Sequence, residues 1–413
     1  MKQKTIPEKK QIVILGGGFA GIRAALDLNN YLHDDDQFEI VLVDRRDYQT
    51  FYSALYEAAT TEHWQIEARS VKRTVTIPLI DVFKNTRVKV FKAFIERIDL
   101  QDGKVVTDSR IIAFDYLIIS MGSVANYFGI PNLDKFSFTL KSLEDAIMIR
   151  NKVEDLVTKK DSAQIVIGGA GFAGTEFAGE LHNLLKHECA HHNKDLSKFK
   201  ILIVEGGTYF LPGLPEKVSS VIAPRMAQMG IESRFSTLIT EAGSNYVMLN
   251  NKERVEMDML IWTGGVKAIK LPVEAELPRD KSDRIGVEQT LNLRSFPNVF
   301  LAGDVACALD PKTKKVVLQT AQEAISQGKH VATNVYRMIK NKNLLPYDPI
   351  SVKFIVPVAG KFAVFYTPNL MTSGFAGWVI RKAADLRYFM SVLPFFTALK
   401  FWLFANQIFM KND

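Results

Sequence analysis

Two stretches of the chain share one hydrophobic pattern, in which a continuous apolar run leads into a glycine-rich turn and then into residues with helical spacing. The first apolar run is 11–15 and the second is 164–167. A short continuous run of this kind predicts a strand that is buried on both faces of a parallel sheet. Because each turn has the spacing Gly-x-Gly-x-x-Gly, each stretch predicts a strand, a tight turn and a helix in that order.

The two turns indicate what the stretches bind. Unpaired backbone amides at the start of a helix form a binding place for a pyrophosphate. One such loop is a weak signal, but two loops in βαβ contexts predict that one chain binds two dinucleotides, as in a flavoprotein that also binds a nicotinamide dinucleotide. The loop residues are Gly16, Gly18, Phe19, Ala20 and Gly21 in the first turn, and Gly169, Gly171, Phe172, Ala173 and Gly174 in the second.

An acidic residue follows each loop at the end of the next apolar run. Asp44 ends the run 38–44, and Glu205 ends the run 200–205. A carboxylate at this place, about 20 residues after the glycines, accepts hydrogen bonds from a ribose hydroxyl. Because a carboxylate repels a 2′-phosphate, Glu205 favours NADH over NADPH. The alternative for either residue is a solvated strand end without a ligand.

The rest of the chain suggests one nucleotide-binding domain inserted into another, because the βαβ pair is its single internal duplication. We therefore expect an α/β fold with two nested Rossmann-type domains and a C-terminal amphipathic helical extension that binds a membrane. Further β segments and glycine-containing strand exits are predicted at 87–90, 104–106, 116–123, 259–265 and 298–304, with a turn at 101–103. The expected domains are 1–128 with 285–345 for FAD, 129–284 for NADH, and 346–413 for membrane anchoring and dimerisation.

Composition narrows the class of protein. With 413 residues, 47% hydrophobic and 23% charged, the chain has the length and composition of two or three folded domains. Its two cysteines, Cys189 and Cys307, exclude a disulfide framework or a CxxC metal site and favour a reducing compartment. Cysteine-based electron transfer next to a flavin is also excluded, so electrons must leave the flavin directly. Residues 1–11 are polar and Lys-rich, which argues against a signal peptide.

The C-terminal residues 351–413 differ from the rest of the chain. They hold 14 of the 43 aromatic residues and seven Lys or Arg against two acids, a net charge of +5 within a total of +7. Residues 375–388 predict a helix with a basic and an apolar face, and the apolar run 389–410 is broken by Pro394 and Lys400. These features favour a segment that lies in the membrane interface on anionic lipids. The alternatives are a spanning helix and a buried core or dimer face. Since the charge is concentrated in an apolar, aromatic tail, nucleic acid is not an expected partner.

A group of histidines falls within the helix predicted after the second glycine loop. His187 and His191 have the i, i+4 spacing of a metal pair. No second set of ligands lies at a recognisable spacing, so we expect surface histidines and no metal site. The group comprises His182, His187, Cys189, His191 and His192.

On these motifs the chain resembles the type II NADH dehydrogenases, single-subunit NADH:quinone oxidoreductases that contain FAD. The resemblance runs nearly end to end, through both glycine loops and the segments 114–122, 302–304 and 320–324. It implies that Asp44 holds the adenosine half of FAD, that Asp304 binds near the ribityl–phosphate portion, and that Gln322 lies beside the isoalloxazine at the quinone end. The other residues that it implies are Arg45, Ala93, Met121, Gly122 and Gly303 for FAD, and Gly264 and Gly265 for NADH.

The resemblance also implies that Glu176 faces the region of nicotinamide and flavin and handles protons. A carboxylate whose pKa is raised by burial is suited to that role. The alternative is an acid in the first turn of its helix that complements the helix dipole. The catalytic candidates are therefore Glu176 and Gln322.

Three positions depart from the pattern of these dehydrogenases. Ser326 stands where the family has a second glutamine, with Gln327 next to it, which affects the expected quinone preference. The segment 51–57 lacks a proline that is common near its centre, and Met121 replaces a smaller or β-branched residue. The last two changes adjust the wall around the flavin.

The expected function is transfer of a hydride from NADH to FAD, followed by transfer of two electrons and two protons to a membrane quinone, without proton pumping. The expected protein is a homodimer bound peripherally to the cytoplasmic face of the cell membrane. One alternative is an FAD-dependent NAD(P)H reductase with another acceptor. Another is a redox-sensing flavoprotein that binds NADH and turns over slowly.

Overall fold

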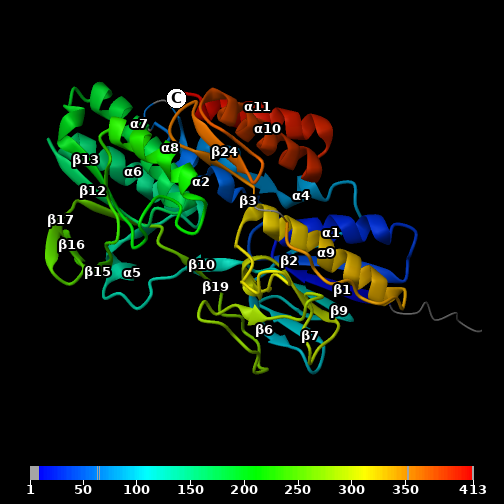
Figure 1. Ribbon diagram of the computed structural model, residues 1–413. Coiled ribbons are helices and arrows are strands. Elements are labelled where there is room, and N and C mark those ends of the chain that lie inside the picture. The colour runs from blue at the N-terminus through cyan, green and yellow to red at the C-terminus, as the bar shows by residue number, and fades with distance from the viewer. Residues whose placement is uncertain (1–8, 63, 65, 351–352, 412–413) are drawn as a thin grey trace, which may run out of the picture. The chain divides into compact units, whose positions relative to one another are not determined.

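The computed structural model describes residues 9–62, 64, 66–350 and 353–411, and its chain divides into two compact units (Figure 1). Unit 1 comprises Met1–Gln49, Ile77–Val124 and Val266–Ser351. Unit 2 comprises Thr50–Thr76, Ala125–Gly265 and Val352–Asp413. Most of the polar, Lys-rich N-terminal segment, residues 1–8, lies outside the described residues.

Unit 1 is built on a parallel five-stranded sheet with the order β21-β9-β1-β2-β5. The apolar run 11–15 forms most of β1, whose residues from Ile12 to Leu15 are fully buried because helices or sheets cover both faces. Helix α1 connects β1 to β2, and α9 packs beside α1 (Figure 1). The bounds are β1 Lys10–Leu15, β2 Phe38–Asp44, β5 Lys89–Lys92, β9 Tyr116–Ile119, β21 Val299–Leu301, α1 Phe19–Tyr31 and α9 Ala321–Ile339.

A three-stranded antiparallel sheet covers part of this unit, and its strands share a hydrophobic core with the parallel sheet. Gly103 has φ +65° in the turn before β7, where the turn at 101–103 was predicted. The bounds are β6 Ile95–Asp99, β7 Lys104–Thr107 and β8 Ile111–Ala113. Shorter elements of the chain near this unit's segments are β3 Tyr48–Thr50, β4 Thr76–Pro78, α4 Leu79–Val82, β10 Ser123–Ala125, β19 Val266–Ala268, β20 Ile285–Gly286, the 3₁₀ helix η3 Gly303–Val305 and β22 Ala306–Cys307.

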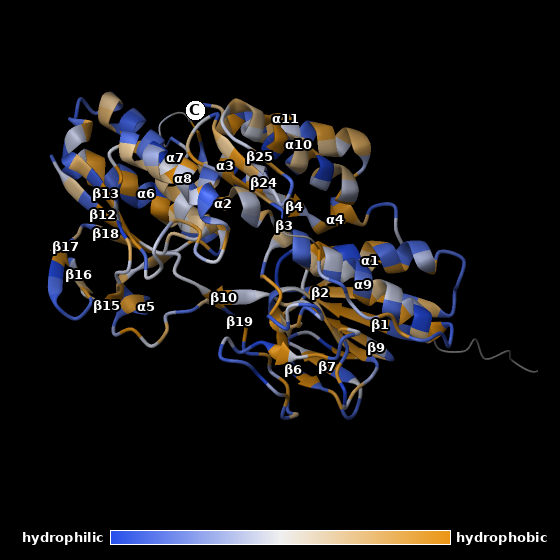
Figure 2. Ribbon diagram, in the orientation of Figure 1, coloured by the Kyte–Doolittle hydropathy of each residue, from blue (hydrophilic) through white to orange (hydrophobic). Residues whose placement is uncertain are grey.

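Unit 2 repeats the same design with a parallel sheet of order β11-β18-β12-β13-β14. The two parallel sheets confirm the predicted α/β fold with two Rossmann-type domains, and Figure 2 shows their strands as mostly hydrophobic. The bounds are β11 Phe138–Thr139, β12 Ala163–Gly168, β13 Phe199–Val204, β14 Glu232–Arg234, β18 Met259–Trp262, α6 Leu143–Lys159, α7 Phe172–His191 and α8 Glu216–Gln228. Smaller elements are α5 Leu133–Phe136, the 3₁₀ helix η2 Leu196–Lys198, and the antiparallel strands β15 Ile239–Ala242, β16 Tyr246–Leu249 and β17 Glu253–Glu256.

The C-terminal segment belongs to unit 2, where it forms a small antiparallel sheet and two helices. Helix α10 ends at Val392 and α11 starts after Pro394, whose fixed φ suits the position before a helix. Within the described residues, no helix combines the length and the apolar composition that crossing a membrane requires. The bounds are β23 Phe354–Pro357, β24 Ala363–Thr367, β25 Leu370–Thr372, α10 Phe375–Val392 and α11 Phe395–Phe409.

Residues 50–76 also belong to unit 2, and a buried arginine holds part of this segment in place. The elements are the 3₁₀ helix η1 Tyr52–Ala54, α2 Leu55–Ala59 and α3 Ala68–Val75. The guanidinium group of Arg150 on α6 donates to the carbonyl oxygens of Thr61 (2.8 Å), Glu62 (2.5 Å) and Ile66. Because Arg150 is 1% exposed, these bonds satisfy a charge that burial would otherwise make costly.

Two basic residues of the helix predicted at 375–388 do not lie on an exposed basic face, so this part of the prediction is wrong. Arg381 and Lys382 are buried at 8% exposure and point into unit 2, where they pair with Asp385 and Glu57. The helical period alone placed them with the exposed cations, because one partner, Glu57, lies more than 300 positions earlier in the chain. Arg387 remains exposed on this helix.

Candidate dinucleotide and proton-transfer sites

The first glycine loop lies between β1 and α1, as its spacing predicted. Gly16 has φ +103°, and a Cβ there would lie 2.5 Å from the carbonyl oxygen of Ser120. Its amide donates to the Val43 carbonyl oxygen over 2.9 Å. The hydroxyl of Ser120, in turn, donates to the carbonyl oxygens of Leu15 (2.9 Å) and Gly16 (3.1 Å). Only glycine fits this backbone.

The second loop, between β12 and α7, has the same geometry. Gly169 also has φ +103°, and a Cβ there would lie 2.7 Å from the Cα of Gly264. Its amide donates to the Val204 carbonyl oxygen over 2.8 Å. Thr263 is the equivalent of Ser120 in this loop, since its hydroxyl donates to the carbonyl oxygens of Gly168 and Gly169 at 3.0 Å each.

Both loops leave the space that a pyrophosphate would need. Gly18 and Gly171 are the N-caps of α1 and α7, neither helix start has a side-chain cap, and a Cβ at either position would meet nothing within 4 Å. In contrast, a Cβ on Gly21 or Gly174 would lie 1.9 or 2.0 Å from the carbonyl oxygen of Gly16 or Gly169. The last glycine of each loop thus lets the helix approach the turn. The middle glycine, Gly18 or Gly171, leaves the helix N-terminus open to an anion.

The two predicted carboxylates lie beside their loops and contact them. The Asp44 carboxylate accepts from the amide of Gly17 (2.6 Å) and from that of Arg46 (2.8 Å). The Glu205 carboxylate accepts from the amides of Ala170 and Gly207, both at 2.7 Å. Each carboxylate is therefore fixed in place, and each oxygen keeps a lone pair for a further donor such as a ribose hydroxyl.

A second polar turn in unit 1 contains the predicted Gly303 and Asp304. Gly303 has φ +76°, and its amide donates to the side-chain oxygen of Gln327 over 2.7 Å. The Asp304 carboxylate accepts from the Ser123 hydroxyl (2.5 Å), and its carbonyl oxygen accepts from the Gln319 amide group (3.0 Å). The sequence did not identify Ser123 and Gln319, because only the fold brings them next to Asp304.

Gln322 lies in the first turn of α9, after the N-cap Thr320. Its side-chain oxygen is buried, and within the part of the chain that the structure describes it has no hydrogen-bond partner. A buried acceptor without a donor is costly, so a donor on a bound group fits here. The side-chain oxygen of Gln327, the neighbour of Ser326, accepts from the Gly303 amide over 2.7 Å.

The other residues predicted for FAD line the same part of unit 1. The amide of Ala93, which follows β5, donates to the Asp44 carbonyl oxygen over 2.9 Å. Met121 packs on the hydrophobic core, and Gly122, with φ +77°, accepts from the amide of Ile269 over 3.1 Å. Arg45 is exposed next to Asp44.

The residues predicted for NADH surround the second loop in unit 2. Gly264 approaches the Gly169 backbone closely, and the carbonyl oxygen of Gly265 accepts from the amide of Asn126 over 3.0 Å. Phe172, the first residue of α7, makes an edge contact with the Phe354 ring at 5.5 Å. Ala173 is exposed.

Glu176, one turn further along α7, is an acid in a strongly perturbed environment. Protein around its carboxyl group raises its pKa to about 8, with desolvation as the largest cause. Arg381 opposes this rise, whereas the charges of Glu57 and Asp385 reinforce it. Glu176 is the fifth residue of α7, and the first turn of that helix contains no acidic residue.

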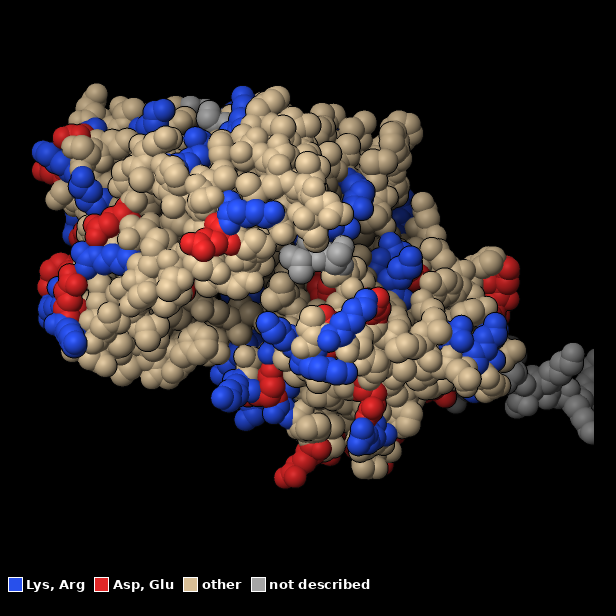
Figure 3. Space-filling model, viewed as in Figure 1, with Lys and Arg blue, Asp and Glu red and all other residues tan. Residues whose placement is uncertain are grey.

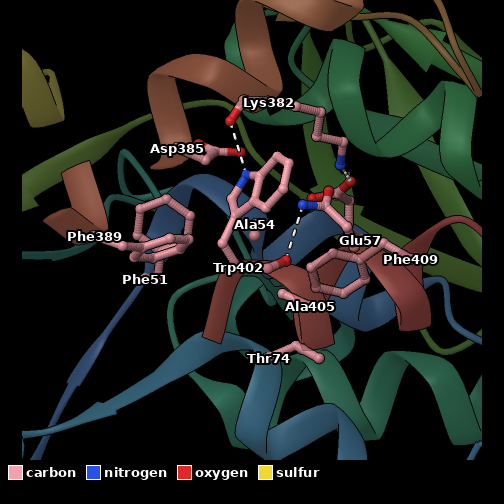
Figure 4. A pocket seen from close by; sticks show the side chains of 11 residues that line it. Phe51, Ala54, Glu57, Thr74, Lys382, Asp385, Phe389, Trp402, Ala405 and Phe409 are labelled. Atoms are coloured by element: carbon pink, nitrogen blue, oxygen red, sulfur yellow. Dashed lines mark hydrogen bonds and ion pairs between the residues drawn. The ribbon is translucent and has the colours of Figure 1, made fainter. Parts of the chain in front are cut away.

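The charges around Glu176 form two ion pairs. Arg381 is paired with Asp385 one turn along α10, and its guanidinium group also donates to the Ser53 carbonyl oxygen over 2.5 Å. The Lys382 ammonium lies 2.9 Å from the Glu57 carboxylate. Figure 4 shows this second pair, with the Trp402 indole donating to the Lys382 carbonyl oxygen over 2.9 Å. The sequence could have predicted only one of these ion pairs, because Arg381 and Asp385 have the i, i+4 spacing of neighbours on a helix.

Two histidines of α7 contact Glu62 or Trp64, so the expectation of plain surface histidines is only partly correct. The imidazole of His187 hydrogen-bonds to the buried Glu62 carboxylate, and His191, which is exposed, stacks on the Trp64 ring at 4.5 Å. His182 is half-buried. Among the described residues, no three His, Cys, Asp or Glu side chains are grouped as a metal site requires.

The two cysteines lie in different units and remain thiols. Burial raises the pKa of Cys189 to about 11 and also raises that of Cys307. A thiolate is the reactive form, so neither residue is poised for disulfide or persulfide chemistry. Cys307 is half-buried, and its thiol donates to Asp280 over 3.7 Å.

Comparison with known proteins agrees with this geometry. The family profile described as pyridine nucleotide-disulphide oxidoreductase matches residues 10–328, a span that includes both glycine loops. The type II NADH:quinone oxidoreductase of Staphylococcus aureus (strain MSSA476) is 27% identical over 384 residues, which cover 87% of this chain and 93% of that relative.

Solved structures share the fold over almost the whole chain. NDH2 from Plasmodium falciparum, in complex with NADH, has a TM-score of 0.82 at 16% identity and covers 97% of this chain and 98% of its own. The sulfide:quinone oxidoreductase from Aquifex aeolicus has a TM-score of 0.78 at 20% identity and covers 92% and 90%. The resemblance to type II NADH dehydrogenases is confirmed by such relatives, and the extent of the profile match shows that the chain belongs to the pyridine nucleotide-disulphide oxidoreductase family.

Proposed function

We propose that this protein is an NADH:quinone oxidoreductase that uses FAD. The observation that carries the proposal is the pair of glycine loops, each with an open helix N-terminus and a fixed carboxylate, in a chain whose relatives include a type II NADH:quinone oxidoreductase. FAD supplies the chemistry that amino-acid side chains lack, accepting a hydride from NADH and giving two electrons to a quinone.

Unit 1 holds the FAD. The helix N-terminus at Gly18 binds its pyrophosphate, and Asp44 binds its adenosine ribose. Asp304 and Gln322 bind further along the cofactor, and the unpartnered oxygen of Gln322 accepts a hydrogen bond from it. The bonds from Ser123 and Gln319 hold Asp304 in place for this contact.

Unit 2 holds the NADH. Gly171 and the start of α7 bind the pyrophosphate, and Glu205 binds the 2′- and 3′-hydroxyls of the ribose next to adenine. The fixed negative charge of Glu205 repels a 2′-phosphate, so NADH is preferred to NADPH. Positioning of the nicotinamide is the main task of this unit, because holding two reactants in place removes much of the entropic barrier.

Glu176 supplies a proton to the quinone. With a pKa of about 8 it carries its proton at neutral pH, and part of its surface stays accessible. A carboxyl group in this state is a suitable general acid for an oxygen that gains electrons in an apolar site. Quinone reduction therefore decreases as the pH rises through about 8, where Glu176 loses this proton.

The exposed face of α10 and α11 binds the membrane that holds the quinone. Few charged residues lie over these helices in Figure 3. The apolar side chains that are exposed there are Phe375, Val379, Met390, Phe395, Phe396 and Leu403, of which Phe396 is 83% exposed. Aromatic side chains with nearby cations, here Arg387 and Lys400, suit the headgroup region. The protein binds the cytoplasmic face of the cell membrane and forms a homodimer. Light scattering of the purified protein tests the dimer.

A comparison of two electron acceptors tests the function. The protein is mixed with NADH and either a quinone in lipid vesicles or ferricyanide, which takes single electrons and no protons. We expect the unmodified protein to turn over with both acceptors. We expect Phe396→Ser to lose vesicle binding and to keep its turnover with ferricyanide. Turnover with ferricyanide but with no quinone would point instead to a reductase with another acceptor. Negligible turnover with either acceptor would point to a redox sensor.

A further inference from the structure

Phe128, three residues after β10, has a backbone conformation that suits its side chain poorly. It has φ +51°, and the next residue, Gly129, has φ +70°. The amide of Ile130 closes the turn by donating to the carbonyl oxygen of Tyr127 over 2.9 Å. Turns with two central residues of positive φ usually contain asparagine, aspartate or glycine there. A bulky aromatic residue in this region of backbone space is an outlier, so the turn itself does not account for the choice of Phe128.

A network of hydrogen bonds holds the strained turn in place. The side-chain oxygen of Asn126 accepts from the Phe128 amide over 3.0 Å, and the Asn126 amide donates to the Gly265 carbonyl oxygen, also over 3.0 Å. The Trp262 indole donates to the Asn126 carbonyl oxygen over 2.8 Å. Both Asn126 and Trp262 are buried. Strained backbone that its surroundings enforce in this way is concentrated at ligand-binding and active sites.

The turn keeps the Phe128 ring out of the hydrophobic core of unit 2. Its neighbours Tyr127 and Ile130 pack on that core, whereas Phe128 is 61% exposed. The ring lies against the backbone of Gly265, where a Cβ would come within 2.9 Å of it. It also makes an edge contact with the Trp262 ring, with 6.4 Å between the centroids. The ring is therefore fixed in position and remains largely uncovered.

The exposed ring lies at the carboxyl end of β18, the strand next to the second glycine loop. A Cβ on Gly169 of that loop would lie 2.7 Å from the Cα of Gly264, and Gly265 is the next residue. In the sheet, β18 lies on one side of β12, and β13, which leads to Glu205, lies on the other. A dinucleotide with its pyrophosphate at the loop and its adenosine at Glu205 therefore extends its second nucleoside toward the end of β18.

We propose that the Phe128 ring packs against the nicotinamide riboside of NADH and holds this half of the dinucleotide at the end of β18. The inference rests on the proposed function, in which unit 2 holds NADH. It adds a contact for the half of the dinucleotide that the glycine loop and Glu205 do not bind. An aromatic side chain suits this task, because it stacks on other flat rings and has few torsions to immobilise.

Binding of two ligands to the flavin-containing protein tests the contact. NAD⁺ carries the nicotinamide riboside and cannot reduce the flavin, whereas ADP carries only the adenosine and the pyrophosphate. In Phe128→Asn we expect NAD⁺ to bind about tenfold more weakly, within the range measured for a lost stack between an aromatic side chain and a base. ADP binds as in the unmodified protein. Calorimetric titration measures both affinities, and the KM for NADH with ferricyanide as acceptor rises by a similar factor.

Further variants separate a ligand contact from a structural role. Phe128→Tyr keeps the ring and therefore keeps the affinity for NAD⁺. Phe128→Asn introduces a residue that suits the turn, so its Tm without nucleotide is equal to or higher than that of the unmodified protein. As a control, Lys314→Asn makes the same kind of exchange at an exposed position of unit 1 with φ +58°. This control leaves the affinity for NAD⁺ unchanged.

Specific results would overturn the proposal. Unchanged affinity for NAD⁺ in Phe128→Asn would show that the ring does not contact the nucleotide. Equal losses of affinity for NAD⁺ and ADP, or a Phe128→Asn protein that unfolds or has a lower Tm, would show that the ring supports the fold instead. An unmodified protein that binds neither ligand would contradict the proposed NADH site itself, whereas one that binds both, with Phe128→Asn unaffected, contradicts the contact alone.

Discussion

The two glycine loops solve one structural problem in the same way and differ in what surrounds them. Gly16 and Gly169 have the same φ of +103°, and each loop is closed by a hydroxyl side chain that donates to its carbonyl oxygens. The surroundings then diverge. Unit 1 adds the polar turn at Asp304 and the buried side-chain oxygen of Gln322, which has no partner among the described residues, whereas unit 2 adds the buried ionic cluster at Glu176. We propose that the loops bind the two dinucleotides, and that the neighbouring residues decide which dinucleotide binds in each unit and which chemistry it takes part in.

Substitution of the last glycine of each loop, Gly21 or Gly174, is expected to have the largest effect and to distinguish the two loops. Alanine at Gly21 or Gly174 would bring its Cβ within 2.0 Å of a backbone carbonyl oxygen, so helix and turn must move apart. We expect Gly21→Ala to give colourless protein without FAD, and Gly174→Ala to give yellow protein that NADH does not bleach. Flavin absorbance after purification and after addition of NADH measures both effects. Flavin loss in Gly174→Ala, with flavin kept in Gly21→Ala, would reverse the assignment of the loops.

Glu176 provides the next largest effect, and it has no counterpart in unit 1. In Glu176→Gln we expect quinone turnover to fall about 100-fold at neutral pH, as for the loss of a general acid. In the unmodified protein the same rate declines as the pH rises through about 8, because the donor loses its proton. Steady-state rates from pH 6 to 9 check both statements. A variant with an unchanged pH profile would show that Glu176 is not the donor.

Substitution of the middle glycine of each loop, Gly18 or Gly171, tests ligand binding without disturbing the fold. A Cβ at Gly18 or Gly171 meets no protein atom within 4 Å and would enter the space assigned to the pyrophosphate. We expect unchanged thermal unfolding of the ligand-free proteins and at least about tenfold weaker binding, equivalent to roughly 1.4 kcal/mol. Gly18→Ala affects FAD, and Gly171→Ala affects NADH. Calorimetric titration measures the affinities, and wild-type affinity in either variant would place the pyrophosphate elsewhere.

The carboxylates provide a smaller effect on specificity. Glu205→Gln removes the negative charge and one of the two oxygens that accept from the amides of Ala170 and Gly207. We expect the preference for NADH over NADPH to narrow by about tenfold, close to the lower end of the roughly 1.5–3 kcal/mol typical of hydrogen bonds to charged groups. Asp44→Asn leaves this preference unchanged and weakens FAD retention instead. The ratio of kcat/KM for the two nucleotides is the measurement, and an unchanged ratio in Glu205→Gln would argue against its ribose contact.

Stability against pH gives the smallest effect. The pKa of Glu176 is about 8 in the folded protein against 4.5 in the unfolded chain, so between these values the folded state binds more protons. The free energy of unfolding contributed by this group therefore falls as the pH rises from about 4.5 to 8. We expect Glu176→Gln to have a higher Tm than the unmodified protein at pH 9 and a smaller advantage at pH 5. Equal Tm values at both pH values would contradict the raised pKa.

The sequence predicted the features that depend on local pattern. Both βαβ units were placed correctly, because continuous apolar runs and glycine spacing are properties of short stretches of chain. The places of Asp44 and Glu205 beside their loops were predicted for the same reason, since Asp44 ends β2 and Glu205 directly follows β13. The turn at Gly103 also arises from local signals.

Features that depend on distant partners were missed. Arg381 and Lys382 were assigned to an exposed basic face because a helical period gives no information about Glu57, which pairs with Lys382 from α2. The bonds from Ser123 and Gln319 to Asp304 likewise join segments that only the fold brings together. No pattern in the chain indicated that Arg150 would bind the carbonyl oxygens of Thr61, Glu62 and Ile66.

Anaerobic mixing is the most direct test of the central claim, that the protein carries electrons from NADH to a quinone. The yellow protein is mixed with NADH, and a quinone in detergent is then added while the flavin absorbance near 450 nm is monitored. Rapid bleaching by NADH, slower bleaching by NADPH, and return of the absorbance with quinone are the results that we predict. Bleaching that quinone does not reverse would contradict the quinone as acceptor, although both dinucleotide sites would still stand.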